Sequence, residues 1–280
     1  MATRPLVTAG FLVAGVLLLA VLLVGTLVLR QDRLMFYPTR RLAATPESFG
    51  LDATELSVVT EDRVRLHGWW IRGPGRRALL YFHGNAGNAA DRLDRARALH
   101  DRLGLDVFLV DWRGYGRSEG SPSEEGLQRD GRAVYRTAVE AGFGPGRIVL
   151  FGESLGAAVA IDLAAKWACA GVVLETPFLS ARALARVHYP WVPLFLVRNG
   201  WDNEARVADI PVPKLFIVAE KDEVAPAAQG RRLFETARGV RELLVIPGAH
   251  HNDVWMVGGE TYWTAWEKFL SSLSLPGRDG

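Results

Sequence analysis

A serine stands in a glycine-framed turn at residues 152–156, where the sequence reads Gly-Glu-Ser-Leu-Gly. An apolar segment, 148–151, precedes the turn, and an alanine-rich helical pattern follows it. G-x-S-x-G between a strand and a helix is typical of a sharp turn that holds a nucleophilic hydroxyl clear of a sheet. Side chains two residues before and after the serine would collide, which is why glycine is needed at both positions. Ser154 is therefore the predicted nucleophile.

A serine hydroxyl reacts well only when a base takes its proton, and a histidine oriented by a carboxylate is the usual base. In the strand–turn–helix arrangement the chain order is serine, then acid, then histidine. Asp222 follows the apolar segment 215–218, and His251 follows the apolar segment 243–246. Ser154, Asp222 and His251 are therefore the predicted catalytic triad.

Three other carboxylates compete for the role of the acid. Glu220 and Glu223 stand beside Asp222 in the same loop, and Glu175 follows an earlier apolar segment. We interpret Glu175 as a structural residue of its loop. Asp222 is preferred because it occupies the usual place of the acid, although an aspartate here is also suited to cap the helix expected near Pro226.

Two adjacent histidines compete for the role of the base. His251 stands three residues after Gly248, which matches the usual G-x-x-H ending after the last strand of this architecture. Neighbouring side chains on a turn point in different directions, so only one of them reaches Ser154. We assign His251 as the base and expect His250 to point away from the triad.

The oxyanion of a tetrahedral intermediate is stabilised by backbone N–H groups. One donor is expected from Leu155, directly after the nucleophile, and the other from the loop 83–88, which reads HGNAGN. We choose the N–H of Asn85 and interpret His83 as a structural residue of this loop. The loop lacks the lysine of a P-loop and the spacing of a dinucleotide fingerprint, and no metal or cofactor is expected.

Short apolar segments alternate with helical patterns along most of the chain. Strands are expected at 56–60, 64–71, 78–82, 107–111, 148–151, 172–174, 215–218 and 243–246, and helices at 89–103, 123–141, 155–167, 227–237 and 259–273. The alternation indicates parallel strands joined by right-handed crossovers, whereas the first two strands form an antiparallel hairpin. We predict an α/β fold with a mostly parallel sheet of about eight strands, helices on both faces, and chemistry at the C-terminal ends of the strands.

The composition excludes several functional classes. Of the 280 residues 49% are apolar and 23% are charged, which excludes a disordered or low-complexity chain. The 33 basic and 31 acidic residues give a net charge of +2, and without a basic cluster no nucleic-acid partner is expected. Cys169 is the single cysteine, which excludes an intramolecular disulfide and a cysteine-based zinc cluster.

An uncharged apolar segment spans residues 9–29. At about 1.5 Å per helical residue it is long enough to cross the hydrocarbon core of a membrane. A cleaved signal peptide is the alternative, but the apolar run is longer than a usual signal core and no small-x-small cleavage site follows Gly25 before Arg30. We predict an uncleaved, single-pass membrane anchor.

The predicted organisation is an N-terminal anchor at 1–30, a connector at 31–50 and a catalytic domain at 51–275. The expected location is a membrane, namely the cell membrane if the source is a bacterium. Basic residues after the anchor, Arg33 among them, favour a cytoplasmic C-terminal side. The orientation stays open, because N-terminal anchors are often exported.

Several motifs resemble those of one known family. They are Phe36-Tyr37-Pro38, HGNAGN, the segments 111–116, 118–120 and 122–127, G-x-S-x-G, and His251-Asn252-Asp253 with Trp255. From about residue 36 to 270 the sequence resembles the membrane-anchored α/β-hydrolase-domain proteins related to the yeast bud-emergence hydrolases, found in bacteria and eukaryotes. The resemblance implies the α/β-hydrolase fold and a serine hydrolase that uses Ser154, Asp222 and His251. Two departures are Trp112, where the family usually has tyrosine, and His250, where it has a small residue.

The segment 176–213 is expected to form a short cap over the site. Its aromatic and leucine side chains either line an apolar acyl pocket or form the core of the cap itself, and both interpretations stay open. The expected function is cleavage of carboxylic esters or thioesters of a small-molecule or lipid-like acyl substrate. A serine aminopeptidase that cleaves amides is the alternative. A non-catalytic membrane scaffold is disfavoured because nucleophile, acid, base and oxyanion loop are all present. The sequence does not predict the oligomeric state.

Overall fold

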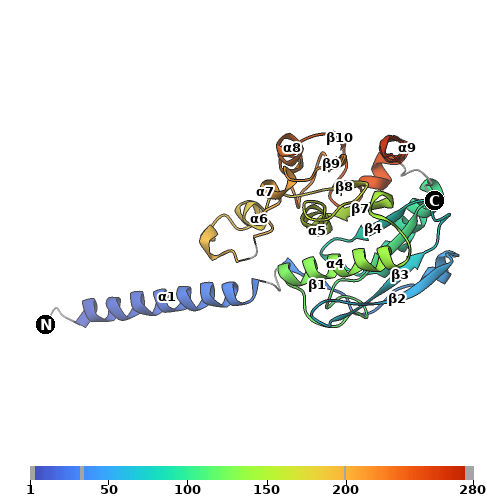
Figure 1. Cartoon of the computed structure of the whole chain (residues 1–280). Helices are drawn as coiled ribbons and strands as arrows, with labels where there is room; N and C mark the ends of the chain where they lie inside the picture. The colour runs from blue at the N-terminus through green and yellow to red at the C-terminus, as the bar shows by residue number, and fades with distance from the viewer. Residues whose placement is uncertain (1–3, 32–34, 199, 275–280) are drawn as a thin grey trace.

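An eight-stranded sheet forms the centre of the computed structural model, which describes residues 4–31, 35–198 and 200–274 (Figure 1). Its strands lie in the order β10-β9-β8-β7-β4-β6-β3-β2. They are β2 (Ala53–Val59), β3 (Arg65–Ile71), β4 (Ala78–Phe82), β6 (Asp106–Val110), β7 (Ile148–Glu153), β8 (Gly171–Glu175), β9 (Lys214–Ala219) and β10 (Arg241–Ile246). The pairs β2–β3 and β3–β6 are antiparallel, and all other neighbours in this sheet are parallel. The predicted mostly parallel sheet is confirmed.

Helices cover both faces of the sheet, as Figure 1 shows. They are α3 (Leu93–Leu103), α4 (Glu124–Glu140), α5 (Leu155–Ala164), α8 (Ala227–Thr236) and α9 (Val254–Ser272), with the short 3-10 helices η1 (Pro46–Phe49), η2 (Ala89–Arg92) and η3 (Pro145–Arg147). Successive strand residues point to opposite faces. Leu80 and Phe82 of β4 therefore join a core with α4 and α5, whereas Leu79 and Tyr81 join a second core with α3 and α9.

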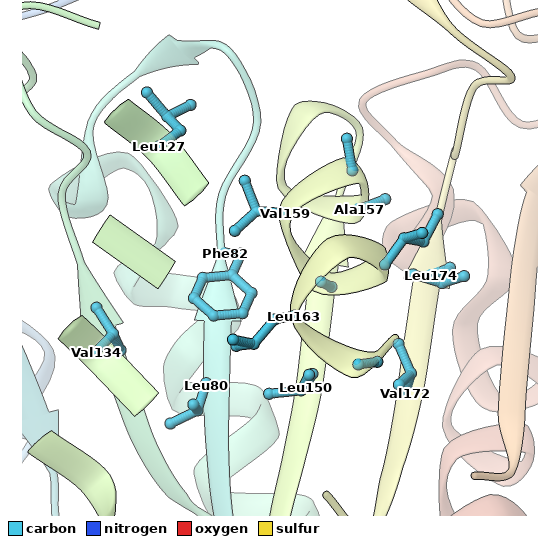
Figure 2. Close-up of a cluster of buried hydrophobic side chains, with 14 of the residues drawn as sticks. Leu80, Phe82, Leu127, Val134, Leu150, Ala157, Val159, Leu163, Val172 and Leu174 are labelled. Atoms are coloured by element: carbon cyan, nitrogen blue, oxygen red, sulfur yellow. The ribbon is translucent and has the colours of Figure 1, made fainter. Parts of the chain in front are cut away.

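Helix α5 is buried along its whole length. All ten of its residues lie in the interior, and the sequence is apolar on every side except for Asp162. A helix that is apolar all round is stable only inside a protein. Figure 2 shows Val159 and Leu163 on the side of α5 that faces α4 and β4, and Ala157 on the other side of the helix. The helix that follows Ser154 is thus held by packing along all of its sides.

Two helices begin four or five residues away from their predicted starts. Helix α9 begins at Val254 instead of residue 259, because its first turn continues through a kink at Gly259, where φ is 47°. The helix predicted at 89–103 begins as the separate 3-10 turn η2, which Asn88 caps by accepting a hydrogen bond from the Ala90 N–H at 3.0 Å. Both changes occur at loop-to-helix junctions, where capping groups decide the geometry.

The cap consists of short elements between β8 and β9. They are α6 (Ala181–His188), the 3-10 turn η4 (Leu194–Leu196) and α7 (Asn203–Val207). Ser180 caps α6 by accepting a hydrogen bond from the Ala183 N–H at 3.1 Å. Much of this segment is exposed, including 82% of Phe195.

The N-terminal helix α1 (Arg4–Leu29) extends away from the rest of the molecule (Figure 1). Among the residues that the structure describes, no helix is long and apolar enough to cross a membrane. Arg33, which entered the orientation argument, and residue 275, the predicted end of the catalytic domain, lie outside the described residues.

Gly156 allows α5 to approach β4 more closely than any other residue type permits. A Cβ atom at Gly156 would lie 1.9 Å from the carbonyl oxygen of Phe82. We expect Gly156→Ala to lower the free energy of unfolding by about 3 kcal/mol or more, because backbone must move to relieve the overlap. Urea unfolding of the detergent-purified protein measures this change.

The matched control is Gly144→Ala. Gly144 has a φ of −62°, and a Cβ atom added there would have no neighbouring atom within 4 Å, so alanine fits at this position. Equal unfolding midpoints for the two variants would contradict the steric argument.

Candidate active site

Ser154 occupies the turn between β7 and α5 in a strained conformation, with φ 53° and ψ −111°. Its backbone N–H donates to the Glu175 carbonyl oxygen at 2.9 Å, and its own carbonyl accepts from the Ala157 N–H at 2.9 Å. A Cβ atom at Gly152 would lie 2.4 Å from the Cα of Ala157. The glycine frame is therefore required by the close return of the chain, and the turn holds the hydroxyl at the edge of the sheet.

The structure brings Ser154, His251 and Asp222 together. His251 Nε2 lies 2.9 Å from Ser154 Oγ. His251 Nδ1 lies 2.9 Å from Asp222 Oδ1 and 2.8 Å from Oδ2. A carboxylate only accepts hydrogen bonds, so Nδ1 carries the proton and Nε2 accepts from the serine hydroxyl. This is the tautomer in which the imidazole can act as a base toward Oγ.

Asp222 is held by the loop that follows β9. Its Oδ1 accepts hydrogen bonds from the N–H groups of Val224 at 2.9 Å and Ala225 at 2.7 Å. The alternative role as the cap of α8 is not observed, because Pro226 is the N-cap of this helix without a side-chain hydrogen bond, and the two N–H groups belong to the preceding loop. Asp222 and His251 are both buried, which strengthens the hydrogen bond between them.

The competing carboxylates have other partners. Glu220 Oε2 accepts from the Gly248 N–H at 2.8 Å. Glu223 Oε2 accepts from His250 Nδ1 at 3.1 Å, and it reaches the backbone N–H of His251 instead of its ring. The His250 side chain is 56% exposed. Glu220, Glu223 and His250 therefore lie around the predicted triad and not within it.

The predicted oxyanion donors lie in two segments, the turn of the nucleophile and the loop that follows β4. Leu155 is the first residue of α5, and the first N–H groups of a helix have no partner within it. Asn85 precedes the short strand β5 (Ala86–Gly87), and its carbonyl oxygen accepts from the Tyr37 N–H at 3.0 Å and from Tyr115 Oη at 2.8 Å. These bonds fix the peptide between Asn85 and Ala86, which follows the peptide that carries the Asn85 N–H.

A second, two-stranded sheet holds this loop in place. Strand β1 (Tyr37–Pro38) pairs in parallel with β5. Asn85 Nδ2 adds a hydrogen bond to the Met35 carbonyl oxygen at 2.9 Å. The sequence analysis did not predict this pairing. The Phe36-Tyr37-Pro38 motif was the available signal, but it does not indicate which segment it contacts.

Glu153 lies beneath the nucleophile in a buried set of charges. Its carboxylate accepts from Tyr81 Oη at 2.7 Å and from Arg92 Nε at 3.1 Å, and Arg95 lies 3.6 Å away. Burial alone would raise the pKa of Glu153, but the charges of Arg92 and Arg95 outweigh it and hold this pKa at about 2. Glu153 is therefore ionised over the whole physiological range.

Arg95 connects this carboxylate to Glu175 at the end of β8. Its guanidinium pairs with the Glu175 carboxylate, and Tyr262 Oη donates to the same carboxylate at 3.0 Å. Glu175 is thus the structural residue that the sequence analysis expected. The roles of Arg92 and Arg95 were missed, although their spacing of three residues in a helical segment places both on one face.

The sequence profile of a family described as "Serine aminopeptidase, S33" matches residues 73–201. The chain is 37% identical to an uncharacterized protein of Mycobacterium tuberculosis H37Rv over 254 residues, covering 89% of this chain and 90% of the relative. It is 33% identical to an uncharacterized membrane protein of Saccharomyces cerevisiae, covering 88% of this chain and 91% of the relative.

The similarity extends to a protein of stated family and to a solved structure. The chain is 31% identical to the alpha/beta hydrolase domain-containing protein WAV2 of Arabidopsis thaliana, covering 90% of this chain and 91% of the relative. The fold is similar to that of the esterase Pf2001 of Pyrococcus furiosus, with a TM-score of 0.70 and 23% identity over 85% of this chain and 99% of that chain. The chain therefore belongs to the α/β-hydrolase family.

Proposed function

We propose that the protein is a serine hydrolase that cleaves carboxylic esters or thioesters through an acyl-enzyme intermediate. The observation that carries this proposal is the hydrogen-bonded chain from Ser154 through His251 to Asp222, with 2.9 Å between Oγ and Nε2. Such a chain supplies both a nucleophile and the base that activates it.

In the acylation step, Ser154 Oγ attacks the carbonyl carbon of the substrate while its proton moves to His251 Nε2. Asp222 stabilises the imidazolium that forms. The N–H groups of Asn85 and Leu155 receive the developing oxyanion. When the intermediate collapses, the bond to the alcohol or thiol breaks, and His251 returns the proton to this leaving group.

In the deacylation step, a water molecule takes the place of the leaving group. His251 accepts a proton from this water, whose oxygen attacks the carbonyl carbon of the acyl-enzyme. The C–O bond to Ser154 then breaks, and Oγ regains the proton from Nε2. The product is a carboxylic acid, and the triad returns to its initial state.

The class of bond is inferred from an apolar cavity between the loop of Asn85 and the cap. An aminopeptidase requires a group that holds the ammonium of the peptide N-terminus, for which a carboxylate is suited. Among the described residues that line this cavity, none is Asp or Glu. Its apolar lining suits the hydrocarbon part of an acyl group, so esters and thioesters are favoured over amino-terminal peptides.

We infer that residues 1–30, which include α1, form a single-pass membrane anchor, joined by the connector 31–50 to a catalytic domain over 51–275. Residues 9–29 carry no charge, and Leu17, Leu18 and Leu19 are each about two-thirds exposed. Such a surface is unfavourable in water. The description of the Saccharomyces relative as a membrane protein supports this inference, and in a bacterium the location is the cell membrane.

We expect Ser154→Ala to abolish covalent labelling by a fluorophosphonate probe and to reduce kcat for ester hydrolysis roughly a million-fold, because the nucleophile is lost. Labelling is measured on the purified full-length protein by in-gel fluorescence. Ser271→Ala, which removes an exposed hydroxyl on α9, is the control and should label like the wild type. Undiminished labelling of Ser154→Ala would refute the assignment.

The adjacent histidines are expected to differ sharply. His251→Ala should lower kcat/KM on p-nitrophenyl acetate by a factor on the order of 10⁴ to 10⁶, because Ser154 loses its base. His250→Ala should change kcat less than about threefold and act mainly on KM, because its side chain pairs with Glu223 outside the triad. A folded His250→Ala protein without activity, next to an active His251→Ala protein, would reverse the two roles.

We expect the full-length protein to remain in the membrane pellet after high-salt and alkaline carbonate washes. The double variant Leu18→Arg, Leu22→Arg should shift to the supernatant, since each arginine at the centre of a membrane helix costs about 2.5–3.5 kcal/mol. The double isoleucine variant at the same positions is the control and should remain in the pellet. Immunoblots of both fractions decide the question, and release of the intact wild-type chain by carbonate would disprove the anchor.

A further inference from the structure

An apolar cavity of about 410 Å³ lies between the end of α1, the connector and the cap. Its walls include Val28 of α1, Met35 of the connector, Ala185 of α6 and Leu196 of η4. Its volume falls within the range of small-molecule sites, which is about 300–1,000 Å³. The cavity thus unites parts of the chain that are more than 150 residues apart in sequence.

Two of the cavity's wall residues connect it to the candidate active site. Asn85 carries one of the proposed oxyanion donors. Val224 donates its backbone N–H to the Oδ1 of Asp222 at 2.9 Å. An acyl group whose carbonyl oxygen faces the Asn85 N–H therefore has this cavity directly beside it.

Three polar side chains in the wall, Gln31, Asn85 and His188, are hydrogen-bonded to the protein itself. Gln31 Nε2 donates to the carbonyl oxygen of Leu196 at 3.1 Å, and its Oε1 accepts from the Arg198 N–H at 2.7 Å. Asn85 Nδ2 donates to the Met35 carbonyl at 2.9 Å. His188 Nε2 donates to the Val224 carbonyl at 2.7 Å. With these groups satisfied, the wall offers mainly hydrocarbon contact to an occupant.

The helix α1 has apolar side chains both at the cavity and on its exposed side. Val24 and Val28 are half-buried against the cavity, whereas Leu22, Leu23 and Leu29 are 58%, 57% and 76% exposed. The same helix therefore presents one apolar side to the cavity and another to its surroundings. If α1 lies in a membrane, an acyl chain passes from lipid to cavity along α1 without crossing water.

We propose that this cavity is the acyl-chain pocket of the enzyme, that the end of the anchor helix forms one of its walls, and that its occupant is the unbranched chain of a membrane-partitioned ester or thioester. The inference rests on the proposed hydrolase activity of Ser154. It assigns to Val28 and Ala185 the selection of chain length, a role outside the catalytic chemistry.

The test measures kcat/KM for p-nitrophenyl esters from acetate to dodecanoate with the full-length protein in detergent micelles. In the wild type we expect kcat/KM to rise about fourfold per added methylene until the cavity is filled, which corresponds to about 0.8 kcal/mol per buried methylene. Partitioning of the esters into micelles is the same for every variant, so the ratio of variant to wild type isolates the pocket.

Val28→Phe fills the cavity from the α1 side. It should leave acetate hydrolysis within about twofold of the wild type and lower dodecanoate hydrolysis at least tenfold. Leu29→Phe adds the same ring at the neighbouring exposed position and should keep the wild-type profile. Retained acetate activity also shows that the Val28→Phe protein is folded.

Ala185→Phe fills the cavity from α6 and should give the same loss on long chains. Its control is Val187→Phe, because Val187 lies on the same helix and is 47% exposed. If the protein hydrolyses the acetate ester but neither Val28→Phe nor Ala185→Phe changes the chain-length profile, the pocket assignment is overturned. The proposed hydrolase function is not affected by that result. Absence of both ester hydrolysis and fluorophosphonate labelling in the wild type would overturn the proposed function and, with it, the pocket.

Discussion

The close contact of α5 with β4 and β7 is the constraint on which the site depends. The contact exists only because Gly152 and Gly156 lack side chains, and it forces Ser154 to a φ of 53°. The strain is sustained because α5 is buried on all sides, so the helix cannot retreat to relieve it. The hydroxyl, the N-terminus of α5 and the C-terminal edge of the sheet consequently meet at one point, where His251 reaches Oγ.

The charges beneath this turn solve a second physical problem. Glu153 and Glu175 end neighbouring strands, and two carboxylates buried side by side would repel each other. Arg92 and Arg95 supply two positive charges for these two negative ones, so the interior holds no net charge there. A buried ion pair adds little net stability compared with apolar packing. The ion pairs instead hold the Ser154 turn in position, because Glu153 directly precedes Ser154 and the Glu175 carbonyl oxygen accepts the Ser154 N–H.

The features that could be predicted from the sequence are those that short local patterns of residues determine. The strands, the glycine frame of Ser154 and the order of the triad residues each follow from a few neighbouring residues, and the fold arranges them as the rule for parallel sheets implies. The β1–β5 pair and the Arg92–Arg95 cluster depend on contacts between distant segments. Pro38 also gives no strand signal in the connector, because proline normally interrupts hydrogen-bonded ladders.

The geometry of the ladder explains why Pro38 is tolerated. Tyr37 and Thr39 donate their N–H groups to the carbonyl oxygens of Asn85 and Gly87. Alternate residues of a strand point their N–H groups to opposite sides, so the missing N–H of Pro38 falls on the side away from β5. The connector can therefore pair with the oxyanion loop through two full hydrogen bonds. Because the Gln31 side chain also donates to the Leu196 carbonyl oxygen, hydrogen bonds join the end of α1 to the cap and the connector to the oxyanion loop.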